Sequence, residues 1–116
     1  MAFSRPGGEN AARARARPLD LEHLSRQTMG DRALEQEVLA MFSHQLGAIR
    51  DGMGKADTAE RRRLAHTLKG SARGVGAFAL ADCAAEIEID PANTTHLARL
   101  GRLIGETRDF IAAISR

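Results

Sequence analysis

The feature of this chain that most constrains its fold is helical periodicity, because apolar residues recur every three or four positions through four segments. Strand-favouring residues are scarce, with four Phe and neither Tyr nor Trp, whereas Ala, Leu, Arg and Glu dominate. At 116 residues the chain is long enough for one domain with a single modest core. We therefore expect an all-α fold.

Capping residues indicate where the first helices begin. A short helix is expected over residues 19–28, with Asp20 as its N-cap. Asp31 can cap a second helix, which we expect to run to about Gly52 and to be followed by a loop over residues 52–57. The apolar face of this second helix is expected to hold Leu34, Val38, Met41, Phe42, Ile49 and Met53.

A third helix is predicted to start at Asp57, because Glu60 follows three positions later as in a capping box. It should end near the glycines at 74–76, which suit a helix C-terminus. The fourth helix should end at Asp90 and Pro91, and we expect this proline to lie in the first turn of the last helix. The apolar faces of these last two helices hold Ala77, Leu80, Cys83, Ala84 and Ile87, and then Leu97, Leu100, Ile104, Phe110, Ile111 and Ile114.

Four amphipathic helices joined by short loops predict an antiparallel four-helix bundle over residues 19–116, with the short first helix as an additional lid. Residues 1–18 carry four arginines and one glutamate, which predicts a disordered basic tail with a net charge of +3. The remaining residues carry a net charge of −1, because the whole chain has a net charge of +2. Phosphate binding needs a basic surface on the fold, so this distribution weakens a nucleic-acid function for the bundle itself.

The sequence also bounds the expected compartment. No apolar run approaches the roughly 18–20 residues that a membrane span needs, and the N-terminal residues lack the hydrophobic centre of a secretory signal. The lone cysteine, Cys83, has no partner for an internal disulfide and lies on an apolar helical face. We therefore expect a cytoplasmic protein in which Cys83 is an inert core thiol.

The segment AHTLKGSARGVGA, from Ala65 to Ala77, carries the residues that point to a function. On a helical wheel of about 100° per residue, the core face of this helix holds Leu64, Leu68, Ser71, Ala72 and Val75. The opposite face holds His66, Lys69, Gly70 and Arg73. His66 is therefore predicted to lie on the surface of the bundle, away from its apolar core.

A glycine inside a helix costs about 1 kcal/mol relative to alanine, so Gly70 requires a reason. It stands four residues after His66, where a side chain would otherwise lie beside the imidazole. We infer that Gly70 leaves a clearing through which a partner surface reaches the ring. A solvated surface histidine without a role is the alternative, and it leaves the weakened helix unexplained.

The chemistry of this face fits a phosphoryl carrier. Neutral imidazole is a good nucleophile near neutral pH, and the charges of Lys69 and Arg73 favour a bound phosphoryl group. We expect no local carboxylate as a general base, and the sequence has no second histidine at the fourth position after His66 and no phosphate-binding loop. The chain should therefore be a carrier without catalytic machinery of its own, rather than an enzyme.

The segment closely resembles the signature of histidine-containing phosphotransfer (HPt) domains, roughly A-H-x-L-K-G-S-x-x-x-x-G-A. The flanking segments L-x-x-x-V-L-x-M-F and L-A-D-C-A-A-E-I-E look like the neighbouring helices of that family, so that the resemblance covers about residues 19–116. It implies a four-helix bundle whose exposed histidine accepts a phosphoryl group from the aspartate of a receiver domain and passes it to another receiver, as a step of two-component signal transduction.

Carried over by position, the resemblance implies that His66 is phosphorylated, that Lys69 stabilises the phosphoryl group and that Gly70 gives the partner access. Arg73, on the same face, would add a favourable charge. The family's catalytic Mg²⁺ and aspartate belong to the receiver, so no metal or cofactor is expected on this chain. The expected partners are response-regulator receiver domains and a hybrid histidine kinase, and the expected state is a monomer.

The remaining positions of the signature imply structural roles. Ser71 faces inward and would bond a backbone carbonyl one turn back, and Gly76 with Ala77 would form the turn into the following helix. Ala72 stands where the family often has a serine, which is a mild departure.

Three other functions remain open at this point. A histidine-kinase dimerisation helix also exposes a histidine, but usually with an acidic residue directly after it and a proline five positions later, where Thr67 and Ser71 stand here. A nucleic-acid-binding module using the basic tail lacks aromatic residues for base stacking. A metal enzyme in the bundle core needs paired Glu-x-x-His segments, and only residues 20–23 come near.

Overall fold

The computed structural model describes residues 17–115, and its secondary structure within that range is helical throughout. The elements are α2 (Leu21–Gln27), α3 (Arg32–Lys55), α4 (Thr58–Val75), α5 (Phe78–Ile89) and α6 (Thr94–Ile114). The expected all-α class is confirmed. The expected basic tail lies outside the described residues, except for Arg17 and Pro18.

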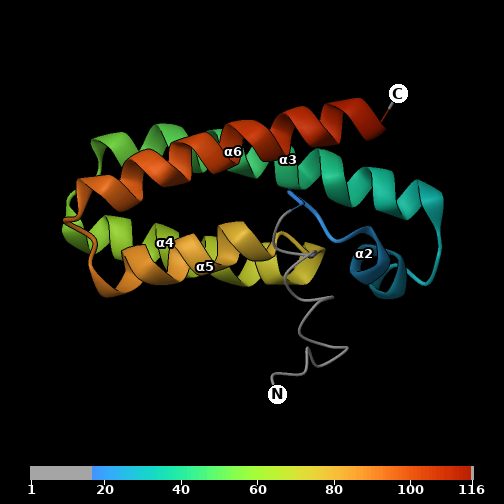
Figure 1. Cartoon of the computed structure of the whole chain (residues 1–116), viewed down its shortest axis with the longest axis horizontal. Helices are drawn as coiled ribbons and strands as arrows, with labels where there is room; N and C mark the ends of the chain where they lie inside the picture. The colour runs from blue at the N-terminus through green and yellow to red at the C-terminus, as the bar shows by residue number, and fades with distance from the viewer. Residues whose placement is uncertain (1–16, 116) are drawn as a thin grey trace, which may run out of the picture.

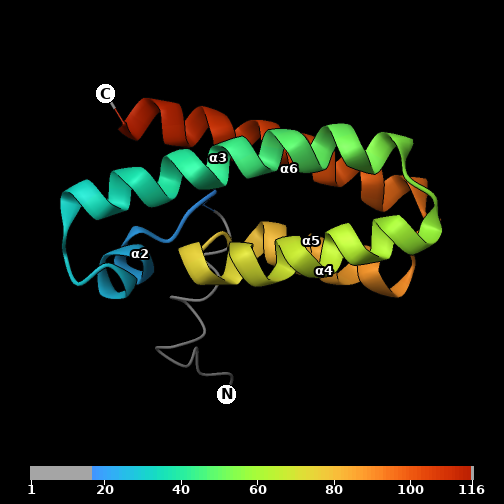
Figure 2. The same cartoon turned by 180° about the vertical axis from the view of Figure 1, so that it is seen from behind.

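The four long helices form an antiparallel bundle, in which each helix runs opposite to the one before it (Figure 1). α4 and α5 pack side by side as one pair, α3 and α6 as the other, and the pairs contact each other through α3 with α4 and α5 with α6. The short helix α2 contacts α4 and lies at the end of the bundle where α4 ends and α3 begins (Figure 2). The predicted bundle with an additional N-terminal helix is therefore confirmed.

The three predicted aspartate N-caps are all in place. Asp20 accepts a hydrogen bond from the backbone N–H of His23, Asp31 from that of Leu34, and Asp57 from that of Glu60 at 2.8 Å. Each bond satisfies a backbone donor that has no partner within its own helix. Local sequence therefore sets the starts of α2, α3 and α4.

Two predicted boundaries are wrong. Helix α3 continues through Gly52 to Lys55, because Met53 is buried and its packing favours one more helical turn over a loop. Pro91 is not in the first turn of α6 but buried in the preceding turn. Asn93 is the N-cap instead, and its side chain accepts hydrogen bonds from the backbone N–H groups of Thr95 and His96.

The buried face of α3 also differs from the predicted one. Met41 is 72% exposed, whereas Leu39 and Leu46, which the predicted face omitted, are buried. Leu39 and Leu46 are seven residues apart and share one face of the helix, and Met41 points well away from it. The core that results includes Phe42 and Ile49 of α3 together with apolar residues of all the other helices.

Gly76 fixes the turn between α4 and α5 and ties the start of the described chain to it. Its φ of +89° is in the left-handed region that favours glycine, and its N–H donates to the carbonyl of Ala72. The Asp20 N–H donates to the Gly76 carbonyl at 2.9 Å. A Cβ at Gly76 would lie only 2.9 Å from the Asp20 carbonyl oxygen, so this close approach requires glycine.

Cys83 lies within the core on α5 and has no exposed surface. Its thiol donates a long hydrogen bond, 3.6 Å, to the carbonyl of His96. Burial raises the pKa of the Cys83 thiol, so the reactive thiolate form is disfavoured.

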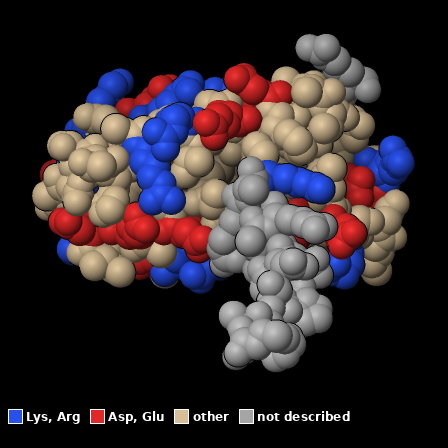
Figure 3. All heavy atoms as spheres, viewed as in Figure 1, with Lys and Arg blue, Asp and Glu red and all other residues tan. Residues whose placement is uncertain are grey.

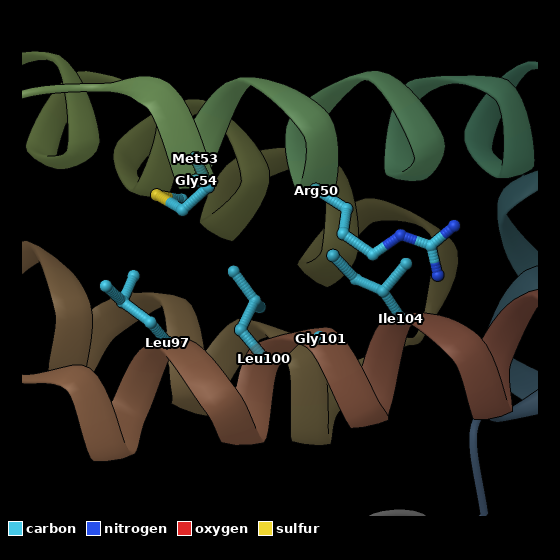
Figure 4. A pocket seen from close by; sticks show the side chains of 7 residues that line it. All are labelled: Arg50, Met53, Gly54, Leu97, Leu100, Gly101 and Ile104. Atoms are coloured by element: carbon cyan, nitrogen blue, oxygen red, sulfur yellow. The ribbon is translucent and has the colours of Figure 1, made fainter.

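An apolar groove lies between helices α3 and α6 (Figure 4). Leu97 and Leu100 line it from α6, and Met53 lines it from α3. The groove is formed by neither α4 nor α5, so it is separate from the surface that carries His66.

Candidate functional site

His66 lies in the middle of α4 on its solvent-facing side, as the helical wheel predicts. Its side chain is 69% exposed, whereas the neighbouring Ala65 and Leu68 have no exposed surface. Gly70 and Arg73 are exposed on the same side of the helix, and Lys69 is partly covered. The predicted residues therefore share one face of α4, and a residue of α5 joins two of them.

That residue is Glu88, in the last turn of α5. Its Oε2 lies 2.9 Å from Nδ1 of His66, and its Oε1 lies 2.6 Å from Nζ of Lys69. Oε1 has almost no solvent-exposed surface, and the ammonium of Lys69 is its ion-pair partner. A single carboxylate thus bridges the histidine and the lysine across the α4–α5 interface.

The expectation that no carboxylate lies near His66 is therefore wrong. Glu88 is 22 residues away along the chain and reaches His66 only because α4 and α5 pack antiparallel. A signal for it was present: Gly76 is ten residues after His66, so a hairpin about that turn places residues near Glu86 and Glu88 opposite the histidine. Glu88 is the functional candidate that the sequence analysis missed.

The contacts of Glu88 determine which nitrogen of His66 carries the proton. The ammonium of Lys69, and secondly His66, hold the pKa of Glu88 below its ordinary value, so the carboxyl is ionised near neutral pH. An ionised carboxylate can only accept hydrogen bonds, and Nδ1 of His66 must therefore donate. In the neutral ring this leaves the lone pair on Nε2, which has no hydrogen bond within residues 17–115.

The packing of residues 17–115 does not require a glycine at Gly70. A Cβ placed on it would meet no atom within 4 Å, and its backbone is helical with no positive φ. Close packing between helices therefore does not explain why this position is a glycine. The side chain of Arg73, one turn after Gly70, makes no ion pair or hydrogen bond with any residue that the structure describes.

A family model for the Hpt domain matches residues 33–114. The chain belongs to the Hpt domain family. Hpt domains are histidine phosphotransfer modules of phosphorelays, and the matched span covers the four helices of the bundle and both sides of the His66–Glu88 contact. Neither a curated protein nor a solved structure matches the chain.

In this Hpt domain Ser71 makes a different contact from the one expected. Its hydroxyl accepts a hydrogen bond from the side-chain amide of Gln45, at 3.0 Å, and so links α4 to α3. The expected bond to a carbonyl one turn back is not formed. A link between helices fits the inward direction of Ser71, because α3 packs on the side of α4 opposite to His66.

The residues behind the metal-enzyme alternative have other roles. Asp20 caps α2, and the ring of His23 lies 3.2 Å from the Gly74 carbonyl and edge-on to Phe78. Between residues 17 and 115, no group of three or more His, Cys, Asp or Glu side chains is arranged to hold a metal ion. In the same part of the chain, every helix is too short or too polar to cross a bilayer.

Proposed function

We propose that this Hpt domain carries a phosphoryl group on Nε2 of His66, accepted from the aspartate of one receiver domain and passed to that of another. The proposal rests on the exposure and the hydrogen bonding of the His66 ring. The His66 side chain is 69% exposed, its Nδ1 is bound to Glu88, and its Nε2 has no hydrogen bond to any described residue. Gly70, one turn later, adds no side chain beside the ring. These are the features that a nucleophile needs when the electrophile arrives on another protein.

The transfer needs little chemistry from this chain. The Nε2 lone pair attacks the phosphorus of the aspartyl phosphate, the P–O bond to the aspartate breaks, and the proton on Nδ1 stays in its bond to Glu88. We propose that the Mg²⁺ and the catalytic carboxylates come with the receiver and that this chain is a carrier rather than an enzyme. Return transfer follows the same path in reverse.

Two cations are proposed to act in the transfer, Lys69 at the phosphoryl group and Arg73 at the receiver. Lys69 lies one turn after His66 and can contact a group on the ring while it remains close to Glu88. Arg73 lies two turns after His66 with its guanidinium unpaired among the described residues, and we propose that it contacts acidic groups around the receiver's aspartate.

The docking surface is proposed to combine these charges with an apolar contact. Ile89 follows Glu88 directly and is 82% exposed, so its side chain can add an apolar contact beside Glu88. Basic and acidic side chains are interspersed on the face of the molecule in Figure 3, so the described part of that face forms no continuous basic patch of the kind that nucleic acid needs. We propose a monomer that docks receiver domains, and a hybrid histidine kinase as the source of the phosphoryl group.

The test is transfer from a phosphorylated receiver domain to the purified protein, followed as acid-labile label. His66→Gln should abolish labelling. His96→Gln is the matched control, since His96 also contacts a glutamate, Glu86, and has a cation, Arg99, three residues later, yet its side chain is only 26% exposed. Normal labelling of His66→Gln, or loss of labelling in His96→Gln, would contradict the assignment.

A further inference from the structure

All three oxygen atoms of Glu88, on α5, contact side chains from one face of α4. The guanidinium Nε of Arg62 donates to the backbone carbonyl of Glu88 at 3.1 Å, Lys69 pairs with Oε1, and His66 donates to Oε2. Arg62, His66 and Lys69 occupy three successive turns of the helix. The carboxylate is therefore fixed both through its own backbone and through its side chain, and cannot swing away from the imidazole without losing several contacts.

A proton on Nδ1 decides how easily a phosphorylated ring gives up its phosphoryl group. When the Nε2–P bond breaks, its electron pair returns to Nε2. A ring that carries a proton on Nδ1 then leaves as neutral imidazole, whereas a ring without this proton has to leave as an imidazolate anion, which is a far poorer leaving group. The carboxylate of Glu88 accepts a hydrogen bond from Nδ1, so it favours the protonated ring.

The charge of Glu88 acts in the same direction. A phosphoryl group on Nε2 adds negative charge on the far side of a ring whose near side already contacts a carboxylate. The ammonium of Lys69, which would otherwise be fully available to the phosphoryl group, is already paired with Glu88. Both effects raise the free energy of the phosphorylated protein relative to the unphosphorylated protein.

We propose that Glu88 makes the phosphohistidine of this Hpt domain short-lived, so that the domain passes phosphoryl groups on quickly rather than storing them. Glu88 is a positioning residue that acts through the Nδ1 proton. In the loss step, water or a receiver carboxylate attacks phosphorus, the Nε2–P bond breaks, and the Nδ1 proton remains on the neutral ring beside Glu88. The inference rests on the proposed role of His66 and adds that the phosphoryl group leaves this residue quickly.

The other charged groups around the ring do not explain such an effect. On α4 itself they are cations: Lys69, Arg62, Arg63 and Arg73. Of these, Arg63 is paired with Glu60. Cations near a ring disfavour its protonated form. Of the elements packed against α4, α3 contacts it through Ser71 on the opposite side and α2 at its C-terminal end, and within the described residues neither brings a charged group to the ring.

The experiment uses the full chain and no receiver domain. The protein is phosphorylated with phosphoramidate, and the attachment to Nε2 of His66 is verified by NMR. The loss of phosphate is timed between about pH 5 and pH 8, the range in which an imidazole titrates. The variant is Glu88→Gln, which keeps the size of the side chain and its capacity to hydrogen-bond but removes its charge. Glu86→Gln is the matched control, because Glu86 also lies on α5 but contacts His96 and Arg99 instead.

We expect the pH profile of phosphate loss to shift by about one pH unit to lower pH in Glu88→Gln. The half-life at alkaline pH should then be about tenfold longer than in the wild type. The two proteins should converge at acid pH, where the ring is protonated without help, and Glu86→Gln should match the wild type throughout. If Glu88 only supported the structure and its charge did not act on the ring, Glu88→Gln would leave the pH profile unchanged.

Equal half-lives at all pH values, or a shorter half-life in Glu88→Gln, would overturn the proposal. So would a failure of phosphoramidate to label Nε2, because the exposed nucleophile that the proposal requires would then be absent. Failure of every receiver domain to exchange phosphate with the protein would count against the proposed function and would leave this result standing. Exchange with receiver domains therefore tests the proposed function separately from the lifetime of the phosphohistidine.

Discussion

Nζ of Lys69 lies 2.6 Å from Oε1 of Glu88, so the cation three residues after the exposed His66 is already ion-paired before any phosphoryl group arrives. The same carboxylate contacts His66, which means that the charge balance at the ring depends on all three side chains together. A substitution at any one of them changes the partners of the other two, and the predictions below follow from this coupling.

Lys69→Ala should slow transfer between a receiver and His66 by roughly tenfold or more, because a charge aimed at the phosphoryl group is lost. The thermal midpoint should fall only slightly, since the Lys69–Glu88 pair is partly solvated. Lys55→Ala is the control: it removes the same charge from the last turn of α3, away from His66. Equal transfer rates for the Lys69→Ala variant and the wild type would rule out the electrostatic role.

Substitutions at Gly70 should affect the stability of the protein and its phosphoryl transfer in different ways. Gly70→Ala should stabilise the protein by up to about 1 kcal/mol, because alanine favours a helix and its Cβ would meet open space. Gly70→Gln should fold as well, but its side chain would stand beside the imidazole and should hinder the receiver. Chemical denaturation and a transfer assay measure the two effects.

Gly105→Gln is the matched control for this pair. Gly105 is a helix-interior glycine of α6 with no atom within 4 Å of an added Cβ. Its substitution should raise stability like that of Gly70 and leave transfer unchanged. A Gly70→Gln protein that transfers at the wild-type rate would contradict the access role of this glycine.

Ile89→Gln should weaken docking of a receiver while leaving the fold intact. The side chain is 82% exposed, so its replacement should change the free energy of unfolding by no more than about 0.5 kcal/mol. The expected effect is a higher receiver concentration for half-maximal transfer, with the maximal rate largely retained. Met41→Gln, at an exposed apolar position of α3, should change neither quantity. A receiver that binds the Ile89 variant as tightly as the wild type would place the docking surface elsewhere.

The pH dependence of stability should reveal the Glu88 contacts. The ammonium of Lys69, followed by His66, holds the pKa of Glu88 below its ordinary value of 4.5. A carboxyl whose pKa is lowered by folding stabilises the folded state above its ordinary pKa, and this contribution is lost as the pH falls through the lowered value. Urea denaturation of the wild type and Glu88→Gln should therefore differ more at neutral pH than well below the ordinary pKa. In a Lys69→Ala background most of this pH-dependent difference should disappear, and its persistence there would mean that Lys69 is not the main cause.

Much of the fold follows from local sequence because its determinants are local. Asp20, Asp31 and Asp57 cap helices through bonds to residues three positions later, and such bonds need no knowledge of the rest of the chain. The exposed face of α4 follows in the same way from helical periodicity, so His66, Lys69, Gly70 and Arg73 could be placed together in advance. Where packing competes with local preference, prediction failed, as at Met53, whose burial extends α3 beyond Gly52.

By itself, then, the sequence determined that the chain is helical, where three helices begin and that His66 is presented to solvent. Only the tertiary structure decided what stands beside that histidine. The contact of His66 with Glu88 joins residues 22 positions apart, and it exists because the Gly76 turn and the buried side chains of α4 and α5 set how the two helices lie against each other. A shift of one residue in that packing would rotate Glu88 about 100° around α5, away from α4, and His66 would lose its carboxylate.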